Sequence, residues 1–233
     1  MHEPSLAQTV ILLALAATFW RMTRRLPLQN VFSCAVIIAL ISGLIQIIGA
    51  KTGIPFGPFF YTENLGYPLF HLLPWPVPLL WVVVLLNSHG VARLILKPWR
   101  NASNHGLRSL ALTCLLAVLF DAVLEPFATR TNRWWIWTSA RTIPIWYGAP
   151  WINFAGWAAT ALLILGFITP WLINKKPGDE PPPDYCPLMI WLTLMLLLTI
   201  GNTFSQFWAA AFLGFATSAF VAFFAWRNSR TQE

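Results

Sequence analysis

Long apolar runs alternate along this sequence with shorter segments that carry most of its charged residues. A helix needs about 20 mainly apolar residues to cross the hydrocarbon core of a bilayer. On this criterion the pattern predicts seven spans, at residues 6–20, 28–50, 69–86, 108–128, 151–172, 187–200 and 204–226. The expected fold is therefore all-α, a polytopic membrane helix bundle that forms one integral membrane domain over residues 1–233.

The segments between the spans differ in character. Three prolines, Pro74, Pro76 and Pro78, lie near the start of the third predicted span, where free N–H groups make proline tolerable. Residues 87–107 are rich in basic side chains and are expected to lie in part along the membrane surface. Residues 174–184, which include three consecutive prolines, predict a linker exposed to water.

Two loops stand out because they combine glycine, proline and aromatic residues. The first follows the second span, and the second follows the fourth. Each leads into a Trp-rich helix, which is a weak indication of internal duplication, although shared composition at a membrane interface gives the same pattern. The residues expected to shape the loops are Gly53, Pro55, Gly57, Gly148 and Pro150.

Positive charges predict the orientation of the bundle. With the N-terminus outside, eleven of the 15 Lys and Arg residues lie at inner ends of spans and four at outer ends. The positive-inside rule therefore favours the N-terminus out and the C-terminus in, with both loops on the outer face. The four outer residues are Lys51, Arg130, Arg133 and Arg141.

Composition narrows the class of protein. The chain is 57% hydrophobic and 10% charged, which is typical of a multi-pass protein of the cell membrane, in contact with the lipid bilayer. Its net charge of +7 is spread over the ends of the runs, so no nucleic-acid partner is expected. The three cysteines are far apart, and the four histidines are not clustered, so neither a disulfide framework nor a metal site is predicted.

Two acids lie within an apolar run, Asp121 and Glu125. Because a charged acid at mid-bilayer costs about 2.5–3.5 kcal/mol on insertion scales, each is expected to face the bundle interior and to have a function. Residues four apart share a helix face, so the pair could supply an acid and a base. The alternative is a structural ion pair with Arg130, Arg133 or Arg141.

The aromatic loop after these acids suits a cavity whose rings stabilise a cation, although single tryptophans commonly anchor a protein at the interface. Polar groups in the spans, such as Gln46, Asn202 and Gln206, are expected to bond between helices. Asn153 differs because it follows this loop directly. The aromatic group comprises Trp134, Trp135, Trp137, Trp146, Tyr147, Trp151 and Trp157.

Several short motifs occur in order along the middle of the chain. They are Gly53-Ile54-Pro55-Phe56-Gly57, Tyr61, Leu65-Gly66, Asp121, Glu125-Pro126, Trp135, Trp137, Tyr147-Gly148-Ala149-Pro150, Asn153-Phe154 and Gly156-Trp157. Together they resemble the carotenoid biosynthesis membrane proteins of the CruF type. The resemblance covers about residues 51–157 and includes two departures, Glu125 where the family has Asp and Phe59 where it has Tyr.

The resemblance implies a carotenoid hydratase that works without a cofactor and adds water to the terminal double bond of an acyclic ψ-end group. Such hydration needs a proton donor, a sheltered tertiary cation and a positioned water. In the resulting hypothesis Asp121 protonates the alkene, Glu125 deprotonates water, with these two roles exchangeable, and Asn153 orients the water. The residues expected to bind the carotenoid are Phe56, Tyr61, Trp134, Trp135, Trp137, Tyr147 and Trp157.

Two rival functions share these features. A carotene cyclase uses the same protonation, but an internal double bond captures the cation in place of water. A non-catalytic subunit could instead bind a carotenoid within a complex of pigment-biosynthesis enzymes, which would then be its partners. The mass of the product separates the enzymes, because only hydration adds a water molecule.

Overall fold

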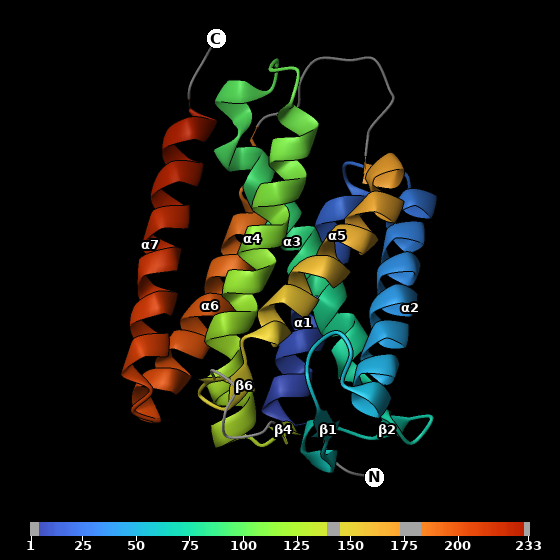
Figure 1. Ribbon diagram of the computed structural model, residues 1–233. Coiled ribbons are helices and arrows are strands. Elements are labelled where there is room, and N and C mark those ends of the chain that lie inside the picture. The colour runs from blue at the N-terminus through green and yellow to red at the C-terminus, as the bar shows by residue number, and fades with distance from the viewer. Residues whose placement is uncertain (1–4, 139–144, 173–182, 231–233) are drawn as a thin grey trace.

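The computed structural model describes residues 5–138, 145–172 and 183–230, and this part contains seven long helices. All seven are long and apolar enough to cross a membrane, which confirms the predicted bundle. The first helix begins at the end of the bundle that carries short strands, and the last helix ends at the opposite end (Figure 1). The helices are α1 (Leu6–Thr23), α2 (Leu28–Thr52), α3 (Pro76–Ile95), α4 (His105–Pro126), α5 (Ile152–Leu172), α6 (Cys186–Phe204) and α7 (Trp208–Ser229).

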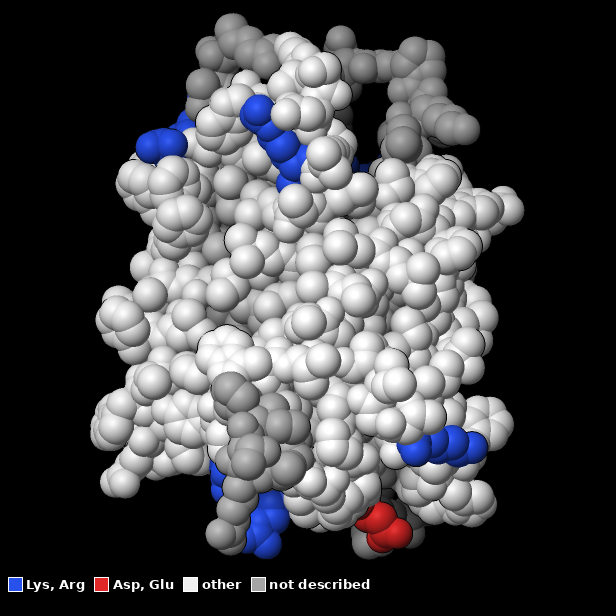
Figure 2. Space-filling model, in the orientation of Figure 1, with Lys and Arg blue, Asp and Glu red and all other residues white. Residues whose placement is uncertain are grey.

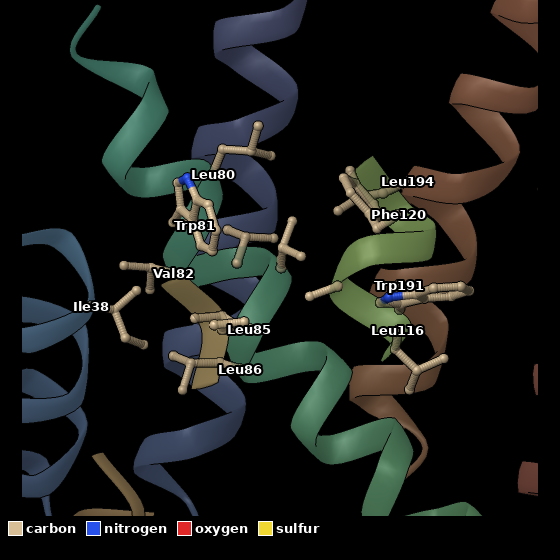
Figure 3. Packing of buried hydrophobic residues seen from close by; sticks show 14 of the residues in the cluster. Ile38, Leu80, Trp81, Val82, Leu85, Leu86, Leu116, Phe120, Trp191 and Leu194 are labelled. Atoms are coloured by element: carbon tan, nitrogen blue, oxygen red, sulfur yellow. The ribbon is translucent and has the colours of Figure 1, made fainter. Parts of the chain in front are cut away.

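Helix α3 forms the centre of the bundle and is buried along most of its length. It packs against α1, α2, α4, α6 and α7. Figure 3 shows Trp81 and Leu85 of α3 near Ile38 of α2, with Phe120 of α4 and Trp191 of α6 packed together nearby. Helix α3 is therefore the element against which these five helices pack.

The start of the third span was predicted wrongly. Residues 69–75 are not helical, and α3 begins at Pro76, because a proline can open a helix but lacks the N–H that a preceding turn would require. The helix also continues to Ile95, so the first residues of the expected surface segment 87–107 belong to the span. Asn87 fits inside the bundle because its amide donates to the Thr18 hydroxyl at 2.8 Å.

The boundary between the last two helices also differs from the prediction. Helix α6 continues past residue 200 to Phe204, and α7 starts only at Trp208. Asn202 does not end the helix, because its side chain is buried and donates to the Val123 carbonyl oxygen at 2.8 Å. Most of the expected linker at 174–184 lies outside the described residues, and the orientation across the membrane stays a prediction.

Short strands join the two distinctive loops at one end of the bundle (Figure 1). Strand β1 (Phe59–Tyr61) pairs antiparallel with β4 (Trp135–Trp137), so the two loops meet. Two small hairpins lie beside this pair, β2 (Pro68–Leu69) with β3 (Leu73–Pro74) and β5 (Ile145–Trp146) with β6 (Ala149–Pro150). The remaining turns are η1 (Glu63–Leu65), η2 (Lys97–Trp99) and the π-helical η3 (Phe127–Thr131).

The central elements repeat at an interval of 76 residues. Strands β1 and β4 start at residues 59 and 135, strands β3 and β6 at 73 and 149, and helices α3 and α5 at 76 and 152. Equivalent residues meet: Phe60 is paired with Ile136, and the rings of Trp81 and Trp157 stack at 4.0 Å. Helix α2 packs on α5 as α4 packs on α3. This arrangement is that of an approximate two-fold axis, and it supports the duplication that the sequence indicated weakly.

The ring of Phe56 lies between α2 and α5, where a glycine on each helix makes room for it. A Cβ atom on Gly49 would lie 2.7 Å from the Phe56 ring, and one on Gly156 would lie 2.6 Å from it. Both distances are too short for carbon atoms in contact. The first loop is therefore held against the bundle by a ring that two glycines admit.

We expect Gly156→Ala to lower the free energy of unfolding by about 1–3 kcal/mol, because the added methyl group overpacks Phe56 and the Pro55 carbonyl. Thermal unfolding of the purified protein in detergent measures the change. Gly166→Ala is the matched control on the same helix, since nothing lies within 4 Å of its added Cβ. Equal melting temperatures for the two variants would contradict the packing described here.

Candidate active site

Helix α4 places Asp121 and Glu125 on its inner face, one turn apart. Their side chains are 0% and 1% exposed, so neither acid faces the lipid. This agrees with the prediction that acids inside an apolar run point into the bundle. The structure also places them at the end of the bundle where the two loops meet.

Strand β4 supplies two hydrogen bonds to Glu125. The indole N–H groups of Trp135 and Trp137 both donate to Oε2, at 3.2 and 3.0 Å. Residues two apart on a strand point to the same side, and this alternation directs both indoles toward the acid. The pairing of β4 with β1 keeps the strand in place.

Helix α5 supplies a donor that links the two acids. The Asn153 side-chain nitrogen donates to Asp121 Oδ2 at 2.7 Å and to Glu125 Oε1 at 3.1 Å. Among the described residues, Asp121 Oδ1 has no hydrogen-bond partner. Glu125 therefore accepts three N–H bonds and Asp121 accepts one.

The alternative of a structural ion pair finds no support in the described part of the chain. Neither acid contacts Arg130 or Arg133 as a salt bridge. Arg130 instead donates from Nε to the Tyr147 carbonyl oxygen at 2.6 Å. Arg141 lies outside the described residues. The donors that satisfy the two acids are all neutral.

A cavity of about 30 Å³ lies against Glu125. A volume near 10–15 Å³ is about what one water molecule needs, so the cavity can hold water but not an isoprenoid end group. An end group could enter only if side chains in its wall move. The wall is formed by Gln46, Phe56, Phe59, Tyr61, Val77, Leu80, Trp81, Leu124, Glu125, Trp135, Trp137, Asn153 and Trp157.

Aromatic rings make up much of this wall. The stacked pair of Trp81 and Trp157 comes from α3 and α5, with an angle of 17° between the rings. Phe59 contacts Tyr61 edge to face at 5.2 Å and Trp137 at 5.1 Å. Aromatic faces attract cations, and they do so more strongly where water is excluded.

A second polar group, formed by Tyr61 and Gln46, lines the cavity together with Glu125. The Tyr61 hydroxyl donates to Gln46 Oε1 at 2.8 Å. Burial, followed by the negative charges of Glu125 and Asp121, raises the pKa of Tyr61 well above its ordinary value. The phenol therefore keeps its proton and remains a hydrogen-bond donor at neutral pH.

The structure brings most of the predicted site residues together, but not all. Phe56, Tyr61, Trp135, Trp137, Trp157, Glu125 and Asn153 line the cavity, and Asp121 is joined to it through Asn153. Trp134 packs instead between Phe127 and Trp135. Tyr147 packs against Trp146 and Phe207, away from the cavity wall.

The predicted loop residues shape the backbone around the site. Gly53 ends α2 in the left-handed conformation, with φ of 77°. Gly57 has φ of 100°, and a Cβ there would lie 2.7 Å from Pro150, so glycine is needed for the two loops to touch. Gly148 has φ of 110° in the turn between β5 and β6, and the Pro55 carbonyl faces Gly156.

Several wall residues were not predicted from the sequence. Gln46 was expected only to bond between helices, although it is the one amide in residues 31–50, and that isolation was the available signal. Trp81 had no signal that separated it from the other aromatic residues, whereas Phe59 was singled out only as a departure from the resemblance and not as a wall residue. Within the described ranges, no group of three or more His, Cys, Asp and Glu side chains could hold a metal ion.

Comparison with known proteins places the chain among pigment-forming proteins. A family model described as carotenoid biosynthesis protein matches residues 6–221, well beyond the expected region 51–157. Bisanhydrobacterioruberin hydratase from Haloarcula japonica is 33% identical over 190 residues, which cover 77% of this chain. The chain spans about 60% of the length of that relative. No solved structure matches.

We expect Asn153→Leu to destabilise the protein by about 1–3 kcal/mol, because it removes the donor that two buried carboxyl groups share. Asn202→Leu is the matched control, since that buried amide donates to a single neutral carbonyl, and its cost should be nearer 1 kcal/mol. Thermal unfolding in detergent compares the two. A larger effect at Asn202 would contradict the role given to Asn153.

Proposed function

The chain belongs to the carotenoid biosynthesis protein family, and from this premise we propose that it is a carotenoid hydratase. The reaction is addition of water to the terminal double bond of an acyclic ψ-end group, which leaves a tertiary alcohol. The observation that carries the proposal is a buried acid pair, held by neutral donors, beside an aromatic cavity. A carotenoid dissolves in the bilayer, where this bundle would meet it.

The first step is a proton transfer from the acid pair. The carboxyl groups of Asp121 and Glu125 share one donor, the Asn153 amide, and such interacting groups titrate as a unit. The proton therefore belongs to the pair and not to either residue alone. Glu125 is the member that lines the cavity and would touch the alkene. As the proton moves to the less substituted carbon, negative charge grows on Glu125, where three N–H groups already point.

The second step is survival of the tertiary cation. Addition of the proton to one alkene carbon makes the other, more substituted carbon a cation. That carbon would lie in the cavity, whose wall includes the rings of Trp81, Trp157, Trp135 and Trp137. Each aromatic face can contribute about 2 kcal/mol when it is dry. The carboxylate of Glu125 balances the charge.

The third step is capture by water. The amide nitrogen of Asn153 is engaged with both acids, so the water-orienting role expected for it passes to Tyr61 and Gln46. Both line the cavity with Glu125. The water oxygen bonds to the cationic carbon, and the water then gives one proton to the acid pair. This proton replaces the one that the pair gave to the alkene.

The hydrogen-bonded pair of Tyr61 and Gln46 also favours a hydratase over a cyclase. A cyclase must keep water from the cation so that an internal double bond can capture it. A tyrosine and a glutamine beside the acid make that exclusion difficult, because their polar groups attract water.

We expect Glu125→Gln and Asp121→Asn each to lower formation of hydrated carotenoid by about 100-fold or more, the usual loss when a general acid is removed. The chain would be expressed in a host that accumulates lycopene, and its pigments analysed by mass spectrometry for addition of one water. Glu63→Gln, a change to an exposed acid at the same end, is the control. Full activity of Glu125→Gln would defeat the proposal.

We expect Tyr61→Phe to lower the hydrated product by roughly 2–10-fold, as loss of one hydrogen bond to a bound water implies, and to raise the share of unhydrated products. The cation is then lost by deprotonation or cyclisation. Tyr67→Phe removes an exposed hydroxyl and should change nothing. An unchanged product ratio in Tyr61→Phe would assign water capture to other residues.

A further inference from the structure

A second, larger cavity lies at the opposite end of the bundle from the acids. Its volume is about 150 Å³, and it is formed by the last turns of α1 and α3, by η2 and by the segment before α6. Five of its wall residues are basic and one is acidic. These are Arg21, Arg25, Arg93, Lys97, Arg100 and Asp184.

The single acid of this wall is already occupied. Asp184 accepts from Arg21 Nε and forms an ion pair with Arg25 at 3.2 Å, and its other oxygen accepts from the Cys186 backbone N–H at 3.1 Å. Lys97 donates to the Ser229 carbonyl oxygen at 2.9 Å, which is a neutral partner. Among the described wall residues, Lys and Arg side chains therefore outnumber carboxylates by five to one.

Arg93 is the residue that most needs an anion. It is exposed at the cavity, and the described part of the chain offers its guanidinium no hydrogen bond or ion pair. The positive charges of Arg21 and Arg25 act on it unfavourably, and the negative charge of Asp184 acts on it favourably. An anion bound between these side chains would relieve the repulsion and accept from the fork of N–H groups that arginine presents.

The position of the cavity fits a membrane surface. On the face seen in Figure 2, basic side chains lie near both ends of the molecule and the middle band is uncharged. The cavity lies at the end that the charge bias predicts to be inside, where anionic phospholipids gather. Basic pockets between helix ends are suited to phosphate groups there.

We propose that this cavity is a binding site for an anionic phosphate group, centred on Arg93 and separate from the acid site. The phosphate of an anionic lipid headgroup and free inorganic phosphate share this chemistry. The lipid would hold the helix ends of α1, α3 and α6 together at the bilayer surface. This site does not depend on the proposed reaction.

The full chain in neutral detergent tests the proposal through its melting temperature, titrated with phosphatidylglycerol, phosphatidylcholine or inorganic phosphate. We expect phosphatidylglycerol to raise the melting temperature of the wild type and phosphatidylcholine to do so much less. Arg93→Gln should weaken the apparent affinity about tenfold or more, because it removes a charged hydrogen bond. An equal Arg93-dependent shift with inorganic phosphate would identify the soluble anion as sufficient.

Arg108→Gln is the matched control, since Arg108 is an exposed arginine at the same end that does not line the cavity. It should bind like the wild type. Native mass spectrometry of the same samples counts the bound lipid directly and does not depend on stability. Equal binding by Arg93→Gln and Arg108→Gln, or no preference for the anionic lipid in the wild type, would overturn the proposal.

Discussion

The carboxyl group of Glu125, with its three N–H donors, is the interaction on which this structure depends. The donors come from β4 and α5, so one side chain of α4 joins three elements that are distant in the sequence. Burial of an acid is costly unless hydrogen bonds satisfy it. All three donors are neutral, and this matters because a cation would hold the acid ionised. The hydrogen bonds therefore stabilise the group inside the bundle without a charged partner.

The approximate two-fold arrangement explains why the repeated region carries the acid in one half and not in the other. At the repeat interval of 76 residues, Gly49 on α2 corresponds to Glu125 on α4. Where one half carries the acid, the other half has no side chain, and the Phe56 ring fills that space. The two halves thus share a framework but differ in chemistry, with the acids on one side of the axis and the neutral Gln46 and Tyr61 pair among apolar side chains on the other.

Length and apolar character predicted the seven helices because the bilayer sets both. The same reasoning found Asp121 and Glu125, since acids in an apolar run need an interior. It failed at residues 69–75, where local proline geometry and not hydropathy decides where the helix begins. It also could not find Gln46 or Trp81, because a helix that is apolar on every side does not reveal which face points to a cavity.

The pairing of β1 with β4 shows a different limit. Placing both loops on one face followed from the count of spans, but the register that sets Tyr61 opposite Trp135 did not. That register decides the site, because it places Tyr61, which donates to Gln46, in the same cavity wall as Glu125. With the cavity only large enough for water, the proposed carotenoid end group would have to displace wall side chains to enter. The hydrogen bonds to Glu125 fix the acid, whereas Phe56 is held in the wall by packing between two glycines, so the two sides of the cavity are held by different interactions.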